Sequence, residues 1–326
     1  MTPVFQHVGI VGAGAMGRGI AQIAAQAGSQ VHLFDVQKSA AESAQAAIFA
    51  QWDRMGEKGK LEATHVSLLK TRLHCAASLG AFSHCDLVVE AVVERLDVKA
   101  SLMAELEAIV QPHTVLASNT SSLSVTAIAA KLKRPEQVAG FHFFNPVPLM
   151  KVVEVIEGLK TAAGVSADLI AYARQMGHTP VKARDTPGFI VNHAGRAYGT
   201  EALRIVNEGV TDFATIDRIL KDQIGFKLGP FELMDLTGLD VSHPVMEAIY
   251  HQYFEEPRYR PSVITTQRLA AGLLGKKSGA GFYTYENGIA QISAEPPAPQ
   301  VDDMPPVWVS PRAARRIELL TLLRNL

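Results

Sequence analysis

The stretch HVGIVGAGAMG at residues 7–17 decides the fold of this chain. It is a short apolar run that ends in a glycine-rich turn, and apolar residues then recur at helical spacing as far as Ala27. Gly28 supplies a stop, and a second apolar run at Val31–Phe34 ends on Asp35. Strand, glycine turn, helix and strand within about thirty residues form the βαβ unit, which predicts a parallel sheet.

The glycine turn is a GxGxxG motif, made by Gly12-Ala13-Gly14-Ala15-Met16-Gly17. The pattern alone also fits an ordinary tight connection. Here it follows a strand, opens a helix and precedes an acidic residue at the end of the next strand, which favours dinucleotide binding. Gly12 allows the turn, Gly14 lets a pyrophosphate approach the helix N-terminus, and Gly17 permits close packing of helix on strand.

Asp35 is placed to accept hydrogen bonds from both ribose hydroxyls of an adenosine. Its charge would repel a 2′-phosphate, so the sequence favours NAD over NADP, although Lys38 nearby carries the opposite charge. The alternative is a solvated turn carboxylate with no ligand. We predict NAD as the cofactor.

Short apolar runs alternate with helical patterns through the first half of the chain. The expected strands are Leu87–Val89, Val115–Ala117, Val138–Phe141, Lys151–Ile156 and Thr179–Lys182, with a helix around Ala167–Met176 before the last of them. This alternation predicts an α/β Rossmann-type fold, doubly wound, in which helices cover both faces of a mainly parallel sheet.

The pattern changes near residue 186, beyond which almost every element is helical. Thr186 and Pro187 resemble the N-cap and first residue of a helix, and Gly229-Pro230 opens a later one. A glycine-rich turn at 275–281 leads into a short strand at Phe282–Tyr285. We therefore expect a Rossmann domain at 1–186 and an all-helical domain at 187–286.

Residues 287–326 are expected to form a linker and an amphipathic helix. The segment Glu295–Pro306 is rich in Pro and acidic residues, which is typical of a linker. After it, an apolar stripe of Ala313, Ile317, Leu320 and Leu323 runs to Leu326 without a capping residue. We expect that further chain follows in the natural product.

Composition narrows the class of protein. The chain has 326 residues and 35.2 kDa, enough for about two domains. Its formal net charge of −1 lacks the basic field of a nucleic-acid or anionic-membrane binder. No signal peptide is recognisable, and the longest uncharged stretch, 109–130, contains too many polar residues for a membrane span. Cys75 and Cys85 are too few for a disulfide framework or a CxxC metal site, so we expect a cytoplasmic protein without a metal.

Polar residues follow two of the expected strands. Ser118–Ser122 comes after one strand and His142–Pro146 after another. Ligands of open α/β sheets bind outside the carboxyl ends of the strands, so both segments should face the reactive end of the cofactor. The alternative for His142 is a packed, hydrogen-bonded core residue.

Glu154 supports a catalytic role for His142. This carboxylate stands among β-branched residues at 152–156, where it needs a partner unless it occupies the solvent-facing side of an edge strand. If the chain reverses at Asn145–Met150, the two strands become neighbours and Glu154 reaches the imidazole. A carboxylate that holds one ring nitrogen leaves the other free to accept a proton, which makes a general base with its orienter.

Two further sites have a functional and an ordinary interpretation. Asn192, in the helix expected to open the second domain, is either a solvated surface residue or a donor to a substrate oxygen at the domain junction. Arg54, Lys58 and Lys60 cluster at the end of a long helix, where they form either a solvated face or a contact for a phosphate-bearing substrate.

Six motifs together resemble the L-3-hydroxyacyl-CoA dehydrogenase family, which includes the 3-hydroxybutyryl-CoA enzymes. They are GAGAMG with Asp35, SNTSSL at 118–123, GFHFFNPVPLMKVVEVI at 140–156, ARDTPGFIVNH at 183–193, GPFELMDLTGLDV at 229–241 and GKKSGAGFYTY at 275–285. The resemblance runs from the first strand to about residue 286. It implies NAD-dependent oxidation of an (S)-3-hydroxyacyl-CoA to the 3-oxoacyl-CoA, as in fatty acid β-oxidation.

The resemblance also implies roles for single residues. His142 is the expected base, Glu154 its partner, Ser121 a contact to substrate hydroxyl and cofactor, and Asn192 a substrate-binding residue. The resemblance also implies that Glu94, Lys99 and Lys277 contact NAD and that Lys58 contacts the CoA moiety. Gln51 stands where the family has a serine, which leaves one CoA contact in doubt.

The family further implies a homodimer formed through the helical domain, and an acyl-CoA thioester as partner. The tail after residue 286 resembles the start of a second C-terminal domain in longer bacterial members, some of which act in aromatic-acid catabolism. Two alternatives remain: an NAD-dependent dehydrogenase of a free hydroxy acid, of the gulonate type, and a non-catalytic structural or cofactor-sensing protein.

Overall fold

The computed structural model describes residues 3–292, 308–311 and 315–324. The chain divides into two compact units, Met1–Gln291 and Ile292–Leu326. The expected linker at 295–306 and the predicted apolar position Ala313 lie outside the described residues. In the second unit, α13 spans Arg316–Arg324, within the stretch predicted to be helical.

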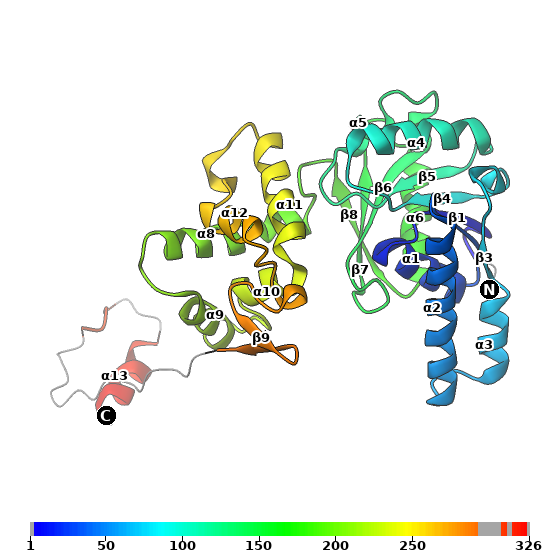
Figure 1. Cartoon of the computed structure of the whole chain (residues 1–326). Helices are drawn as coiled ribbons and strands as arrows, with labels where there is room; N and C mark the ends of the chain where they lie inside the picture. The colour runs from blue at the N-terminus through cyan, green and yellow to red at the C-terminus, as the bar shows by residue number, and fades with distance from the viewer. Residues whose placement is uncertain (1–2, 293–307, 312–314, 325–326) are drawn as a thin grey trace. The chain divides into compact units, whose positions relative to one another are not determined.

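An eight-stranded sheet forms the core of the first unit (Figure 1). Its strands are β1 (His7–Val11), β2 (Gln30–Phe34), β3 (Leu73–Cys75), β4 (Leu87–Glu90), β5 (Val115–Ser118), β6 (Val138–Phe143), β7 (Val152–Glu157) and β8 (Thr179–Arg184). They lie in the order β3-β2-β1-β4-β5-β6-β7-β8, and all neighbours are parallel except β6 and β7. This order confirms the predicted doubly wound sheet.

Helices cover both faces of this sheet because the strand residues alternate between two apolar clusters. The covering elements are α1 (Ala15–Gln26), α2 (Lys38–Glu57), α3 (Ala63–Lys70), η1 (Leu79–Phe82), α4 (Leu96–Ile109), α5 (Val125–Ala129), η2 (Pro135–Gln137) and α6 (Ala163–Gln175). Val8 and Ile10 of β1 pack with α1, α2, α3 and α6, whereas Val11 packs with η1, α4 and α5. Such alternation follows from the two-residue period of a strand.

The helical domain contains most of the remaining elements of the first unit. They are α7 (Val191–Ala194), α8 (Arg196–Asn207), α9 (Phe213–Asp222), α10 (Pro230–Thr237), α11 (Leu239–Gln252), η3 (Pro257–Tyr259), α12 (Val263–Ala270), η4 (Lys276–Ser278), β9 (Thr284–Glu286) and β10 (Ile289–Gln291). Phe231, Phe282 and Leu203 lie in its buried core. Asp217 and Asp235 are also buried, and each accepts two backbone N–H bonds and a tyrosine hydroxyl.

Two details of the sequence-based prediction are wrong. No helix begins at Thr186–Pro187; the chain forms a turn there, because Gly188 and Phe189 have φ values of 77° and 51°, and α7 begins only at Val191. Strand β3 was missed, since three residues are too short for a periodicity signal. None of the described helices combines the length and the apolar composition needed to cross a membrane.

Candidate active site

His142 and Glu154 lie directly opposite each other on neighbouring strands. The chain turns back between β6 and β7, and the antiparallel register pairs His142 with Glu154. Nδ1 of His142 is 2.7 Å from Oε2 of Glu154, and the two residues are 4% and 0% exposed. The predicted contact is therefore present. No described residue hydrogen-bonds to the other ring nitrogen, and the rings of Phe144 and Phe189 lie 4.5 and 5.8 Å from the imidazole.

The second oxygen of Glu154 links the sheet to the helical domain. Oε1 accepts hydrogen bonds from the backbone N–H groups of Ile190, at 2.8 Å, and Val191, at 2.9 Å, where α7 begins. Burial raises the pKa of Glu154, but the hydrogen bonds from His142 and these amides outweigh burial and leave the pKa below its ordinary value. Glu154 is therefore a carboxylate at neutral pH, which can only accept a hydrogen bond, so Nδ1 of His142 is the donor.

A serine- and threonine-rich loop follows β5 and is held by Glu94. Oε1 of Glu94 accepts from the hydroxyl of Thr120 at 2.6 Å and from the backbone N–H of Ser121 at 2.8 Å and of Ser122 at 3.1 Å. The hydroxyl of Ser121 lies 3.3 Å from the same oxygen. The geometry thus joins two residues that were predicted separately as cofactor contacts.

Lys99 is buried and forms an ion pair with Glu94. Its ammonium is 1% exposed, 2.6 Å from Oε1 of Glu90 and 3.2 Å from Oε2 of Glu94. Burial raises the pKa of Glu94, but Lys99 and the hydrogen bonds from Thr120 and Ser121 outweigh it, so the pKa is lowered. The predicted direct contact between Lys99 and a cofactor does not fit this burial, and we assign Lys99 a positioning role instead.

Asn192 joins the helical domain to the loop that carries Ser121. It is the second residue of α7 rather than one to two turns into a helix, as the sequence suggested. Its Nδ2 donates to the backbone oxygen of Ser121 at 3.2 Å, across 71 positions of sequence. Gln252 of α11 donates in the same way to the oxygen of Ser122, at 2.7 Å. One N–H of the Asn192 amide remains for another acceptor.

The glycine turn fits a dinucleotide. Gly12 has a φ of 101°, and a Cβ there would lie 2.5 Å from the backbone oxygen of Ala91. A Cβ on Gly17 would meet the oxygen of Gly12 at 1.8 Å, whereas one on Gly14 would meet nothing within 4 Å. Gly14 is the N-cap of α1, so the open space lies where amide groups attract a phosphate.

Asp35 stands beside this turn and faces a cavity of about 760 Å³. Its Oδ2 accepts from the N–H of Ala13 at 2.8 Å and its Oδ1 from the N–H of Gln37 at 2.9 Å. The cavity is lined by Gly12, Gly14 and Asp35 together with apolar side chains of α4, of η1 and of residues 91–93, which follow β4. A charged carboxylate at the rim of an apolar cavity suits the ribose and base of an adenosine.

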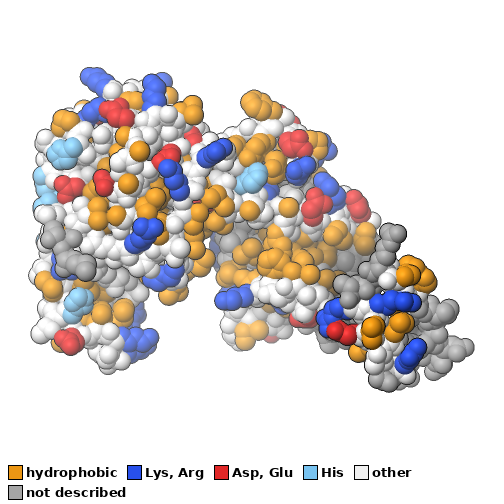
Figure 2. All heavy atoms as spheres, turned by 180° about the vertical axis from the view of Figure 1, so that it is seen from behind, with side chains coloured by type: hydrophobic (Ala, Val, Ile, Leu, Met, Phe, Trp, Pro, Cys, Tyr) orange, Lys and Arg blue, Asp and Glu red, His pale blue; other side chains and the backbone are white. Residues whose placement is uncertain are grey.

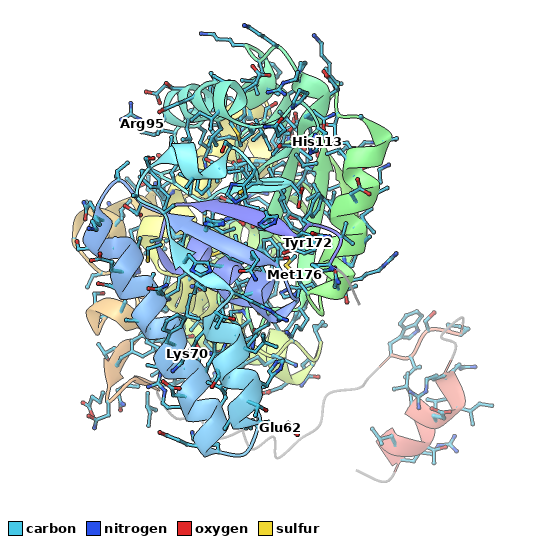
Figure 3. All side chains as sticks on the ribbon, turned by 90° about the vertical axis from the view of Figure 1, so that its right-hand side faces the viewer. Glu62, Lys70, Arg95, His113, Tyr172 and Met176 are labelled. Carbon is cyan, nitrogen blue, oxygen red and sulfur yellow. The ribbon has the colours of Figure 1, made fainter. Side chains whose placement is uncertain are left out.

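Two predicted contacts lie apart from these residues. Lys277 belongs to the helical domain, where its ammonium lies 2.5 Å from Asp240. Lys58 is the exposed C-cap of α2. Figure 3 shows Glu62 at the end of the α2–α3 hairpin that is far from the sheet and Lys70 nearer to the sheet. Lys58 precedes Glu62 by four residues.

The sequence analysis missed several residues of the site. Glu90 at the end of β4 is fully buried between Lys99 and Ser118, whose hydroxyl donates to it at 2.8 Å. Asn119 accepts a hydrogen bond from the backbone of Phe143, which ties β5 to β6. The signal that identified Glu154 was a carboxylate next to β-branched residues of a strand, and Glu90, which directly follows Val88 and Val89, carried a related signal.

Comparison with known proteins identifies the class. Residues 7–186 match the family model for the 3-hydroxyacyl-CoA dehydrogenase NAD-binding domain, and residues 188–285 match the model for the C-terminal domain of the same enzymes. The chain belongs to the 3-hydroxyacyl-CoA dehydrogenase family, as its motifs had indicated. The family match supports NAD as the cofactor of the first domain.

Individual relatives agree with this assignment. The chain is 44% identical over 280 residues to a 3-hydroxyadipyl-CoA dehydrogenase of Escherichia coli, covering 86% of this chain and 59% of that protein. It is 42% identical over 281 residues to a probable 3-hydroxybutyryl-CoA dehydrogenase of Bacillus subtilis, covering 86% and 98%. The chain thus spans little more than half of the first relative.

Solved structures show the same architecture. A 3-hydroxybutyryl-CoA dehydrogenase from Escherichia coli superposes with a TM-score of 0.87 at 42% identity, covering 92% of this chain and 63% of that one. An (S)-3-hydroxybutyryl-CoA dehydrogenase from Ralstonia eutropha superposes with a TM-score of 0.83 at 37% identity, covering 87% and 100%. The Rossmann sheet and the helical domain therefore have experimental counterparts.

Proposed function

We propose that this protein oxidises (S)-3-hydroxyacyl-CoA thioesters to 3-oxoacyl-CoA with NAD, reversibly. The observation that carries the proposal is the buried pair of His142 and Glu154, 2.7 Å apart, at the carboxyl end of β6. It stands at the edge of the sheet where the glycine turn ends β1 and the serine loop ends β5. Family membership supports the same reaction.

His142 acts as the general base. Because the Glu154 carboxylate accepts a hydrogen bond from Nδ1–H, the proton of the neutral ring stays on Nδ1, and the opposite nitrogen carries the lone pair that takes the proton of the substrate hydroxyl. The glycine turn and Asp35 would hold NAD, which would supply the acceptor for the hydride that leaves C3. The imidazolium that forms is stabilised by the Glu154 carboxylate, which remains held by Ile190 and Val191.

Ser121 and Asn192 orient the reacting oxygens. The hydroxyl of Ser121 is on the loop that Glu94 holds, and the Asn192 amide is attached to the same loop. Both side chains thus occupy fixed positions at the junction of the two domains. Glu94 and Lys99 keep this loop in place. We expect Glu94 also to contact the cofactor.

We expect Asp35→Ala to raise the KM for NAD by about 10- to 100-fold, since two hydrogen bonds to a charged acceptor are lost. The same change should raise the ratio of NADP to NAD activity, because the repulsion of a 2′-phosphate disappears. Initial-rate kinetics with both cofactors measure this. Glu42→Ala, which removes an exposed carboxylate of α2, is the matched control and should change neither value. An unchanged cofactor ratio in the Asp35 variant would contradict the assignment.

Lys58 should bind a phosphate of the CoA moiety. We expect Lys58→Ala to raise the KM for an acyl-CoA about 2- to 5-fold with kcat unchanged, which is the effect of one exposed ion pair. The KM for the corresponding N-acetylcysteamine thioester, which has no phosphate, should stay the same. Lys160→Ala, an exposed lysine elsewhere, is the control. A change with both thioesters would argue against a phosphate contact.

Steady-state assays test the proposed function as a whole. A panel of 3-hydroxyacyl-CoA thioesters from C4 upward, with a dicarboxylate included, should show NADH formation, and the preferred chain identifies the substrate. Activity with free hydroxy acids and none with thioesters would favour the gulonate-type alternative. No turnover with any member, despite NAD binding, would favour a non-catalytic protein.

We also propose a homodimer through the helical domain. Large apolar side chains are exposed there on consecutive elements, namely Ile205, Val210, Ile219, Ile224, Phe226, Leu228, Leu233, Leu236 and Val241. Figure 2 shows hydrophobic side chains gathered over this part of the molecule. A patch of this kind is typical of an interface. Sedimentation velocity on the full chain tests the proposal.

A further inference from the structure

Three histidines from separate segments meet on one face of the sheet. His7 begins β1, His32 lies in β2, and His84 lies in the turn between η1 and β4. One ligating atom from each lies within 4.8 Å of the others. The ring of His84 is 5.0 Å from that of His7 and 5.1 Å from that of His32, at steep interplanar angles.

The parallel register explains why they converge. Gly9 pairs with His32, so His7, two residues before Gly9, points to the same face as His32. Gly9 leaves this face open, and Phe82 of η1 packs against it: a Cβ on Gly9 would lie 2.9 Å from the Phe82 ring. The close approach of η1 carries His84, two residues after Phe82, onto the two strand histidines.

The three histidines have the properties expected of metal ligands. Nδ1 of His7 is buried and has no hydrogen-bond partner among the described residues. Burial, together with the neighbouring imidazoles of His84, His74 and His7, lowers the pKa of His32 to about 4. Oδ2 of the nearby Asp86 accepts hydrogen bonds from the backbone N–H groups of Gln6 and His7. A buried nitrogen without a partner is costly, and a bound cation would satisfy it.

We propose that His7, His32 and His84 bind one Zn²⁺ ion, with water completing a tetrahedral site. Neutral imidazoles are the ligands that borderline divalent metals prefer, with Zn–N distances of about 2.0–2.1 Å. The three nitrogens must approach one another to bind a common ion, and the exposed side chain of His84 has room to turn toward the other two.

The site is separate from the dehydrogenase chemistry. His7 is at the amino end of β1, whereas the glycine turn follows the carboxyl end, about 15 Å away at the rise of a strand. The ion would connect β1, β2 and the turn that precedes β4. Its role would therefore be structural, and it does not depend on the function proposed above.

Isothermal titration of the metal-free full chain with ZnCl₂ tests the proposal. We expect one Zn²⁺ per chain, and X-ray absorption should show nitrogen or oxygen ligands at about 2.0 Å. His84→Ala and His32→Gln should each weaken this binding at least about 10-fold. His65→Ala, which removes an exposed histidine of α3, and His142→Gln, in the candidate active site, should leave it unchanged.

Thermal unfolding provides a second readout. Excess Zn²⁺ should raise the Tm of the wild-type chain by roughly 5 °C and that of His84→Ala by much less. The absence of stoichiometric binding in the wild type would overturn the proposal. So would unchanged affinity in His84→Ala, a variant expected to fold because the side chain is exposed, or loss of binding in His142→Gln.

Discussion

His142→Gln should lower kcat by about 10²- to 10⁴-fold, the range that a positioned general base contributes. Glutamine can still donate a hydrogen bond to Oε2 of Glu154, so the buried carboxylate keeps a partner. It offers no lone pair with the basicity of imidazole, however, and the substrate hydroxyl loses its proton acceptor. Steady-state NADH formation with a hydroxyacyl-CoA measures the effect.

The cofactor site should be unaffected by this change. The glycine turn and Asp35 belong to β1, α1 and β2, and none of the hydrogen bonds that hold them involves His142. The Kd for NADH, measured by fluorescence, should therefore match that of the wild type. Near-wild-type turnover in His142→Gln would reject the assignment of the base.

Glu154→Gln should lower kcat by a comparable factor, for a different reason. The oxygen of the amide is required by the N–H groups of Ile190 and Val191, so its NH₂ group must face Nδ1 of His142. Nδ1 then becomes an acceptor, and the proton moves to the nitrogen that should act as the base. An amide that selects the wrong tautomer in this way costs up to about 10⁴-fold in a comparable triad.

The same variant should change the pH dependence of stability. The folded pKa of Glu154 is lower than its unfolded value, so the ionised carboxylate stabilises the folded state above the unfolded pKa of about 4.3. This contribution is lost as the pH falls through the lower folded pKa. Glu154→Gln should therefore be less stable at pH 7, by roughly 1–3 kcal/mol, and the difference should shrink in acid.

Glu157→Gln is the matched control for the effect on kcat. Glu157 ends the same strand, and its carboxylate bonds to the exposed Lys182 and to the buried Ser166 rather than to the imidazole. We expect its kcat to equal that of the wild type. Equal losses in the two variants would show that damage to β7, and not the tautomer of His142, explains the result. Urea unfolding at pH 7 and at a series of values below about pH 4.3 provides the stability measurement.

Local patterns were sufficient for the Rossmann half of the molecule. The apolar runs at 7–11 and 30–34 and the glycines between them occur within one βαβ unit, so neighbours in sequence are neighbours in space. The sequence pattern gave a wrong prediction where the backbone conformation depended on individual residues. Thr186-Pro187 has the composition of a helix start, yet the left-handed backbone of Gly188 and Phe189 delays the helix to Val191.

The contact between His142 and Glu154 was predictable because only a short reversal separates the two strands. The attachment of Glu154 to Ile190 and Val191 was not, since those residues lie 36 and 37 positions further along the chain. The same holds for the contact of Asn192 with Ser121, which lies 71 positions earlier in the chain. These contacts depend on how the helical domain meets the sheet.

The sequence by itself therefore determined the elements, the cofactor motif and the base with its orienting carboxylate, because each follows from periodicity or from residues close along the chain. Only the tertiary structure decided which groups complete the site, and it also brought together His7, His32 and His84, whose spacing follows no metal-binding motif. The physical reason is that strand order and register, which no local pattern encodes, set the distance between residues far apart in sequence.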